Sequence, residues 1–387
     1  MQLAARMDRL GTETAFEVLA RARELQAQGR EIIHLEIGEP DFDTPPHIVQ
    51  AAVEALRRGH THYTPSAGIP ELRAVVAQEV ARTRHVALDP QQVVITPGAK
   101  PIMFFSLLAL CQEGDEVIYP NPGFPIYESM INFVGAVPVP LRLREEDEFR
   151  IDREEFPSLV TPRTRLIILN SPENPTGSVL CQEDLEVIAQ CGIEADVMVL
   201  SDEIYSRILY DGEHRSIASL PGMAERTIIL DGFSKTYAMT GWRIGYGVMP
   251  HELAEHMARL MVNSNSCTAA FTQWAGIEAL TGPQDAVEEM VAAFRKRREV
   301  IVEGLNNIPG FRCRPPQGAF YAFPNIEGTG LRSKEMQDYL LEEAGVATLA
   351  GTSFGAYGEG FLRLSYANSV PNIRQALERI KEAVGKL

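Results

Sequence analysis

Short runs of almost uninterrupted apolar residues recur between residues 92 and 249, and segments of mixed polarity separate them. Strands that helices cover on both faces have this pattern, whereas half-exposed strands alternate apolar and polar positions. The pattern therefore predicts an α/β fold with a mostly parallel, seven-stranded sheet between helices. The seven expected strands read QVVIT, DEVIYP, VPVPL, TRLIILNSP, DVMVLSDE, RTIILDG and RIGYGVM.

The segments on either side of this region have a different character. Residues 14–29 place Phe16, Leu19 and Ala20 at the spacing of an amphipathic helix, and a proline-rich hinge, GEPDFDTPPHI, follows. From Gly282 onward a long charged helix precedes short strands and further helices. We expect a large domain over residues 46–282 and a smaller α+β domain built from residues 1–45 and 283–387.

Composition limits the partners of the chain. Its 387 residues include 36 Lys and Arg against 52 Asp and Glu, a formal net charge of −16 without a basic stripe, which argues against nucleic acid as a partner. Charges throughout the first thirty residues argue against a signal peptide or membrane span, so we expect a soluble, cytoplasmic protein. The scattered cysteines lack metal-site spacing, and we expect small buried side chains and no metal: Cys111, Cys181, Cys191, Cys267 and Cys313.

Polar residues gather where the expected strands end. Ligands of parallel α/β sheets bind outside the carboxyl ends of the strands, so these residues are candidates for one site. They are Gly98, Ala99 and Lys100 after the first strand, Asn170 and Asn174 after the fourth, Asp202 and Tyr205 after the fifth, and Lys235 and Arg243 after the sixth.

Each candidate also has a simpler explanation. Gly98 can form an ordinary turn into a helix, Asp202 can cap a helix, and Asn174 sits in turn-forming sequence. Lys235 can extend its amine to solvent, and Phe124 can be core packing. Their common position at strand ends is what favours a shared site.

The combination suits one cofactor. A buried lysine without a partner can form a Schiff base with the aldehyde of pyridoxal phosphate, and Lys235 has that position. Asp202 can hold the pyridine nitrogen, and Tyr205 and Asn174 can donate to the ring oxygen. Phe124 can stack on the ring.

The phosphate of such a cofactor needs a helix N-terminus and a cation. The turn of Gly98, Ala99 and Lys100 opens a helix, and Arg243 supplies a guanidinium. The sequence therefore predicts a phosphate site between these two segments.

These segments resemble the class I/II aminotransferases, the fold type I enzymes that depend on pyridoxal phosphate, and their aspartate/aromatic branch in particular. The resemblance rests on IGEPDFDTP, HYTPSAGIPELR, NSPENPTG, SDEIYS, GFSKTYAMTGWRIGY and FLRLSYANS, which follow the family's order over essentially the whole chain. GFSKTYAMTGWRIGY is the most specific of them, whereas NPTG alone is not specific.

The resemblance implies roles for further residues. Lys235 matches the family's cofactor lysine, Asp202 the pyridine partner, Arg363 the arginine for the substrate α-carboxylate, and Gly38 a glycine beside that carboxylate. Tyr63, and with it Asn265, match residues that reach the phosphate of a neighbouring subunit, which implies a homodimer with shared active sites.

One position departs from the family pattern, and a second has two possible roles. Gly232 stands where many relatives have a serine that binds the phosphate, and Ser234 is the candidate to replace it. Lys100 has two alternative roles, to bind the distal carboxylate of aspartate or glutamate or to neutralise the cofactor phosphate. A second arginine for the distal carboxylate is not recognisable.

The expected reaction moves an amino group from an L-amino acid, preferably of the aspartate type, to a 2-oxo acid such as 2-oxoglutarate in two half-reactions. The alternatives are an aminotransferase for aromatic, branched-chain or alanine substrates, or a C–S lyase on the same fold. A cofactor-sensing regulator would need a basic DNA-binding module, and GWRIGYG lacks the spacing of a nicotinamide site.

Overall fold

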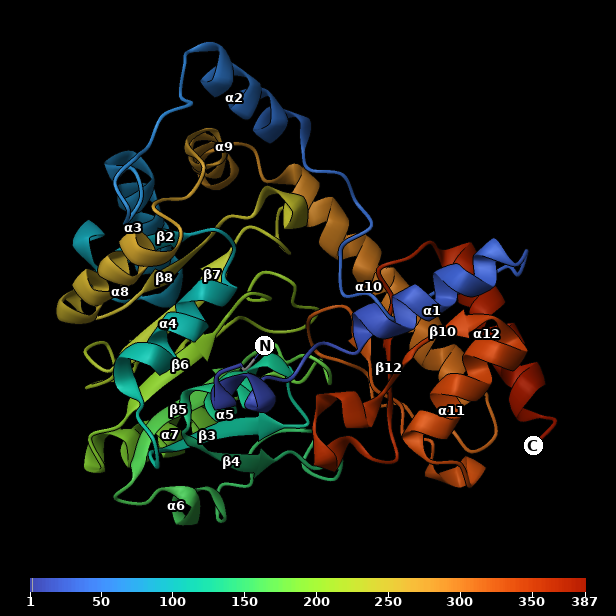
Figure 1. The fold of residues 1–387 in the computed structure, drawn as a ribbon. Coiled ribbons are helices and arrows are strands. Elements are labelled where there is room, and N and C mark those ends of the chain that lie inside the picture. The colour runs from blue at the N-terminus through green and yellow to red at the C-terminus, as the bar shows by residue number, and fades with distance from the viewer. Residues whose placement is uncertain (2) are drawn as a thin grey trace.

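A twisted seven-stranded sheet forms the centre of the computed structural model, which describes residue 1 and residues 3–387 (Figure 1). The strand order is β2-β8-β7-β6-β5-β3-β4. The strands are β2 (Val93–Thr96), β3 (Glu116–Asn121), β4 (Val137–Arg142), β5 (Thr164–Asn170), β6 (Met198–Asp202), β7 (Thr227–Gly232) and β8 (Gly245–Val248). All seven expected strands are present, and the predicted α/β class is confirmed.

Strand β8 is the exception to parallel order, because it runs antiparallel to both β7 and β2. A parallel connection needs a crossover of a dozen or more residues, usually a helix. The twelve residues 233–244 between β7 and β8 contain no α-helix to cross the sheet, only the short 3₁₀ turn η4 (Thr240–Trp242). The return is therefore antiparallel, which the uninterrupted apolar pattern could not indicate.

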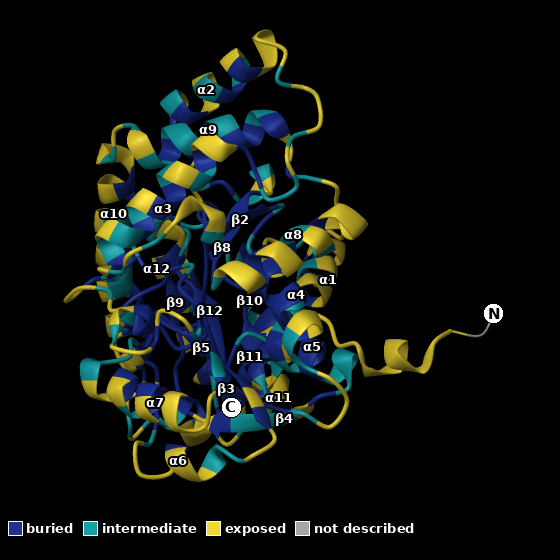
Figure 2. Cartoon of the chain, turned by 90° about the vertical axis from the view of Figure 1, so that its left-hand side faces the viewer, coloured by how far each residue is buried: buried dark blue, intermediate teal, exposed yellow. Residues whose placement is uncertain are grey.

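Helices cover both faces of the sheet and bury its strands (Figure 2). Successive residues of β2 face opposite sides: Val94 packs with α4, α5 and α8, whereas Val93 and Ile95 pack with α2, α3 and α9. Strand β4 lies at the sheet edge, where Val137 is exposed, so full coverage was wrong for this strand. The helices are α2 (Pro46–Arg57), α3 (Pro70–Arg84), α4 (Lys100–Leu110), α5 (Ile126–Val134), α6 (Phe156–Leu159), α7 (Gln182–Glu194), α8 (His251–Ser264) and α9 (Ala270–Thr281).

The C-terminal part packs beside this sheet together with helix α1 (Figure 1). Its antiparallel sheet has the order β11-β12-β9, and β1 pairs in parallel with β10. The elements are α1 (Ala15–Ala27), β1 (Ile33–His34), α10 (Asp285–Asn306), β9 (Tyr321–Ala322), α11 (Ser333–Tyr339), β10 (Val346–Ala347), β11 (Leu349–Ala350), β12 (Leu362–Ser365) and α12 (Val370–Val384). Helix α10 is the long charged helix predicted after Gly282.

The buried face of helix α1 differs from the face that the spacing of Phe16, Leu19 and Ala20 predicted. Its buried residues are Val18, Ala22 and Leu25, whereas Phe16 is 61% exposed and Ala20 is also exposed. Phe16 lies at the first turn, where it faces a cavity described below. The predicted helix is present, but the assignment of Phe16 and Ala20 to its packed face was wrong.

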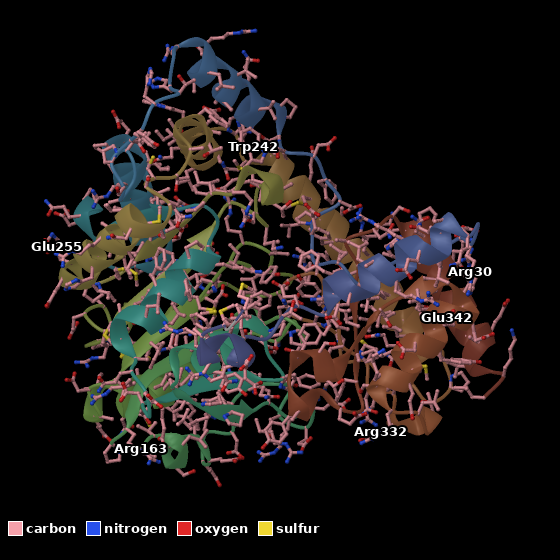
Figure 3. All side chains as sticks on the ribbon, viewed as in Figure 1. Arg30, Arg163, Trp242, Glu255, Arg332 and Glu342 are labelled. Atoms are coloured by element: carbon pink, nitrogen blue, oxygen red, sulfur yellow. The ribbon has the colours of Figure 1, made fainter. Side chains whose placement is uncertain are left out.

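The N-terminal residues touch both parts of the chain. Gly11 N donates to Ser129 Oγ of α5 at 2.9 Å, whereas Arg30, after α1, pairs with Glu342 at 3.3 Å near the C-terminal helices (Figure 3). The expected domain division at residues 45/46 and 282/283 stays a prediction.

The remaining helical turns are short. They are η1 (Ala5–Arg9), η2 (Pro90–Gln92), η3 (Ile217–Ser219), η5 (Glu327–Thr329), the π turn η6 (Leu340–Ala344), η7 (Gly351–Phe354) and η8 (Ala356–Gly358). No helix among the described residues has the length and apolarity to cross a membrane. All five cysteines are free thiols, but only Cys313 is buried, so the expectation of five buried side chains was wrong.

Candidate active site

A cavity of about 370 Å³ opens at the carboxyl ends of the parallel strands, between the large sheet and the C-terminal part. Strands β2, β5, β6 and β7 bring their C-terminal residues to this edge because they run in the same direction. Most of the residues singled out in the sequence line the cavity: Gly38, Ala99, Lys100, Phe124, Asn170, Asn174, Asp202, Tyr205, Ser234, Lys235, Arg243 and Arg363.

Lys235 follows β7 and points its amine into the cavity. Its Nζ donates to the Gly38 carbonyl oxygen at 2.5 Å, and no carboxylate of the described residues forms an ion pair with it. Desolvation by the surrounding protein lowers its pKa to about 8. A lysine in this state is available as a neutral amine close to neutral pH.

Asp202 ends β6 and is buried at the floor of the cavity. Its Oδ2 accepts a hydrogen bond from the Tyr127 hydroxyl at 2.6 Å, and its Oδ1 accepts from Ile204 N at 3.2 Å. Burial raises the pKa of this carboxyl to about 7, although both hydrogen bonds act in the opposite direction. The carboxylate therefore lacks a cation in the described residues and can be stabilised by a positively charged ring nitrogen.

The turn after β2 meets Arg243 at one end of the cavity. Gly98 has a left-handed φ of +84°, and a β-carbon there would collide with the Arg243 guanidinium. Arg243 is exposed, donates from Nη1 to Thr240 O at 2.8 Å, and has no carboxylate partner among the described residues. This corner therefore combines the N-terminus of α4 with a cation that no protein anion neutralises.

Gly232 stands opposite Gly245 in the β7–β8 pair. A β-carbon on Gly232 would lie 2.9 Å from Gly245 Cα, and one on Gly245 would lie 2.5 Å from Ala99 N. The close approach of these backbones leaves no room for a side chain at position 232 in this structure. Ser234 lines the cavity two residues later, so its hydroxyl remains the candidate for that contact.

Arg363 lies on β12 and reaches the cavity from the C-terminal part. It is only 4% exposed, yet it has no carboxylate partner in the described residues: its Nη1 donates to Asn174 Oδ1 at 3.1 Å and its Nη2 donates to Glu36 O. Its Nε is buried without a partner, and desolvation lowers the pKa of the guanidinium. A buried guanidinium in this condition is a site for an anionic ligand.

Tyr205 and Asn174 approach the cavity from two large-sheet loops. The Tyr205 hydroxyl lies 2.7 Å from the Tyr321 hydroxyl, and burial raises the pKa of Tyr205 well above its usual range. Asn174 N donates to Asn170 Oδ1 at 2.9 Å, which fixes the loop that carries it. Both side chains therefore have defined positions before any ligand binds.

Lys100 and Phe124 form the outer wall of the cavity with residues from the N-terminus. The Lys100 amine pairs with the Glu13 carboxylate and lies 5.3 Å from the centroid of the Phe124 ring. Glu13 and Phe16 both line the cavity. The lysine therefore carries an internal counter-ion, unlike Lys235, Arg243 and Arg363.

Tyr63 and Asn265 are not brought to this cavity. Tyr63 is 89% exposed on the segment between α2 and α3, and Asn265 is exposed at the end of α8.

Sequence patterns did not single out Tyr127, Tyr321 and Glu13 as site residues. Tyr127 lies at the first turn of α5, three residues after Phe124 in NPGFPIY, and this proximity to Phe124 in the sequence was the available signal. Tyr321 belongs to the apolar run GAFYAF, which reads as core, and Glu13 precedes the first helix in a polar segment. Their role depends on contacts between distant segments.

A buried ionic cluster supports the strand ends from beneath. Arg84, at the end of α3, donates to Glu203 Oε2 at 2.8 Å and to Asp231 Oδ2 at 2.6 Å. Glu203 and Asp231 neighbour Asp202 and Gly232 in sequence, so the cluster ties β6 and β7 together just below the cavity. Unlike Arg363, this buried arginine is fully paired.

Comparison with known proteins gives a consistent result. The family model described as aminotransferase class I and II matches residues 30–380. The aspartate aminotransferase of Pyrococcus abyssi is 41% identical over 98% of both chains, and aromatic-amino-acid aminotransferase 2 of Thermococcus litoralis is 44% identical over 92% of this chain and 93% of its own. The structure is similar to that of aspartate aminotransferase from Thermus thermophilus with maleate, with a TM-score of 0.95 and 39% identity over 99% of this chain and 100% of the other.

Proposed function

Because the chain belongs to the class I and II aminotransferases, a family that depends on pyridoxal phosphate, we propose that it transfers the amino group of an aspartate-type L-amino acid to a 2-oxo acid such as 2-oxoglutarate. The aminotransferase activity follows from the family. The preferred side chain and the role of each residue are the proposal.

One observation carries the assignment of roles: Lys235, Arg243 and Arg363 face the same cavity without any carboxylate partner in the described residues. Cations that protein anions do not neutralise favour anionic ligands or covalent use of the amine. A phosphate at Arg243, a substrate carboxylate at Arg363 and an aldehyde at Lys235 account for all three.

The residues present fit pyridoxal phosphate as the cofactor. The buried Asp202 carboxylate lacks a cation, Phe124 offers a ring face, and Gly98 leaves room for Arg243 beside the N-terminus of α4. Ser234 and Ala99 complete the phosphate corner. When bound, pyridoxal phosphate supplies an aldehyde carbon and an electron-withdrawing ring.

The protein's own residues bind the substrate and move a proton. Arg363 holds the α-carboxylate with two parallel N–H donors beside Asn174 and the Gly38 backbone. Lys235, as a free amine with its pKa lowered to about 8, takes the proton from the substrate α-carbon and returns it. The Asp202 carboxylate would form an ion pair with the protonated pyridine nitrogen of the cofactor. The Tyr205 hydroxyl would donate a hydrogen bond to the cofactor's ring oxygen.

Lys100 is the residue that would select a dicarboxylate. Its amine lies beside the proposed ring-stacking residue Phe124 and on the cavity wall, where the distal carboxylate of aspartate can replace Glu13. The Thermus enzyme was solved with maleate, a dicarboxylate, which agrees with this preference.

Aromatic substrates are the second candidate. Glu13 already neutralises Lys100, and Phe16 lines the cavity next to it, so the wall also suits an uncharged ring. The aromatic-amino-acid aminotransferase of Thermococcus litoralis is among the relatives.

A homodimer with shared active sites is part of the proposal. Exposed Tyr63 and Asn265 would contact the cofactor phosphate of a second copy. Sedimentation of the full chain, with Tyr63→Ala and Tyr63→Phe compared for cofactor affinity, tests this. A monomer with full affinity would contradict it. We also propose the domain division at residues 46 and 282 and a cytoplasmic location.

Turnover of purified, cofactor-loaded chain with single amino acids and 2-oxoglutarate tests the substrate. Aspartate should exceed tyrosine and alanine in kcat/KM. A reversed order favours the aromatic candidate, and ammonia release from cystathionine without 2-oxoglutarate would indicate a lyase.

A further inference from the structure

Two tyrosines in the cavity come from different parts of the fold and share one hydrogen bond. Tyr205 follows β6 of the large sheet, whereas Tyr321 begins β9 of the C-terminal sheet. Their hydroxyl oxygens lie 2.7 Å apart, and their rings meet edge to face with centroids 5.8 Å apart. Tyr205 is 4% exposed and Tyr321 is 1% exposed, so packing fixes this contact.

We infer that Tyr321 is a positioning residue: it donates its hydroxyl proton to Tyr205 and thereby makes Tyr205 a stronger donor to the cofactor's ring oxygen. Each phenol has one proton to donate. In the chain as described either hydroxyl can be the donor. Once Tyr205 gives its proton to the ring oxygen, only Tyr321 can donate within the pair, and a hydroxyl that accepts a hydrogen bond donates more strongly.

The ring of Tyr321 has a second, separable contact. The guanidinium carbon of Arg363 lies 4.5 Å from the ring centroid, a cation–π geometry. The hydroxyl also packs against Gly38, because a β-carbon on Gly38 would collide with it. The hydroxyl of Tyr321 thus serves the cofactor side, and the ring face serves the arginine proposed for the substrate carboxylate.

A matched control exists in the same hydrophobic core. The Tyr366 hydroxyl donates to the Tyr210 hydroxyl at 3.1 Å, and both side chains are buried. Neither residue is among those that line the cavity. Tyr366→Phe therefore removes a comparable hydroxyl pair without touching the proposed site.

The spectroscopic test uses the full chain loaded with pyridoxal phosphate. Donation to the ring oxygen lowers the pH midpoint of the visible absorbance band, so Tyr321→Phe should raise that midpoint by about half a pH unit. Tyr205→Phe should raise it further, and adding Tyr321→Phe to Tyr205→Phe should have no additional effect. Tyr366→Phe should leave it unchanged.

An unchanged midpoint in Tyr321→Phe, or an equal rise with and without Tyr205, would overturn the inference. Substrate affinity gives an independent readout. Tyr321→Phe keeps the ring and should change the KM for aspartate by less than about twofold, whereas Tyr321→Leu should raise it about tenfold. Equal losses in both variants would contradict the separate role of the hydroxyl.

This inference rests on the proposed function, and the two can fail separately. If the unmodified chain shows no visible band with pyridoxal phosphate, the proposed function fails. The tyrosine pair is then measured in the cofactor-free chain by a double-mutant cycle, where a coupling of about fivefold in the unfolding equilibrium constant is expected. Strictly additive effects of Tyr205→Phe and Tyr321→Phe would refute the hydrogen-bonded pair.

Discussion

Replacement of Arg363 by alanine should abolish most amino-acid binding while leaving the fold intact. A substrate carboxylate would accept two charge-assisted hydrogen bonds from this guanidinium, each worth about 1.5–3 kcal/mol. Their loss amounts to about 3–6 kcal/mol, which weakens binding by about 10²–10⁴-fold. Because Arg363 has no protein carboxylate to release, no buried anion is left unpaired in the variant.

The assay is a titration of the cofactor-loaded chain with aspartate and with maleate, a dicarboxylate that has no amino group. Arg363→Lys keeps the charge but not the planar fork, so its affinity should lie between those of the wild type and Arg363→Ala. The affinity for pyridoxal phosphate should stay within about threefold, because Arg363 is assigned to the substrate alone. Unchanged binding of both ligands by Arg363→Ala would refute the reasoning.

Replacement of Arg84 should destabilise the fold more than replacement of Arg363. Arg84 is buried like Arg363, 5% against 4% exposed, but it is paired with Glu203 and Asp231. Arg84→Ala should lower the free energy of unfolding by about 3–5 kcal/mol, since the buried Asp231 carboxylate loses its cation and Glu203 keeps only His214. Arg363→Ala should lower it far less, and equal destabilisation would mean that Arg363 is a structural residue.

Three further outcomes are expected. Lys235→Ala should lose turnover completely and show no adduct on that residue after borohydride treatment with pyridoxal phosphate; an active variant would exclude the role of Lys235. Tyr127→Phe removes a donor to the ionised form of Asp202, so the pKa of that carboxyl should rise above about 7, and the pH dependence of cofactor affinity should shift upward with it. An unshifted profile would separate Tyr127 from Asp202. Glu13→Gln should raise kcat/KM for aspartate about three- to tenfold by freeing Lys100, with little change for tyrosine; the opposite order would show that Glu13 helps dicarboxylates bind.

The raised pKa of Asp202 also makes the free energy of unfolding depend on pH. Its pKa in the folded chain is about 7 against a usual 3.8, so its contribution to stability is fully present below pH 3.8 and is lost as the pH rises through 7. In the cofactor-free chain, Asp202→Asn should remove this part of the pH profile, as measured by unfolding at several pH values.

The sequence was sufficient to predict the seven strands and the residues at their carboxyl ends. Apolar runs identify buried strands, and the rule that parallel strands end at one edge places Asn174, Asp202 and Lys235 together without knowledge of strand order. A charged or amide residue directly after such a run can therefore be predicted as a site residue from a single sequence.

Other features depend on contacts that no local pattern contains. The direction of β8 goes with a connection that contains no crossover helix, and the buried face of α1 follows from where the helix docks. Tyr127 and Tyr321 are aromatic residues in apolar segments, so their hydroxyl contacts emerge only when β6, α5 and β9 are assembled. Glu13 meets Lys100 across 87 positions of the chain.

The cavity has a floor and a wall of unequal freedom to change. Beneath the floor, Gly232 and Gly245 let the backbones of β7, β8 and the turn after β2 approach closely, so added side chains there would displace strands that hold the cofactor residues. The wall with Glu13 and Phe16 lies at the start of α1, and its backbone is joined to α5 by the hydrogen bond from Gly11 N to Ser129 Oγ. Substitutions at Glu13 and Phe16 are therefore the place to alter substrate preference without disturbing the strands that carry Asp202 and Lys235.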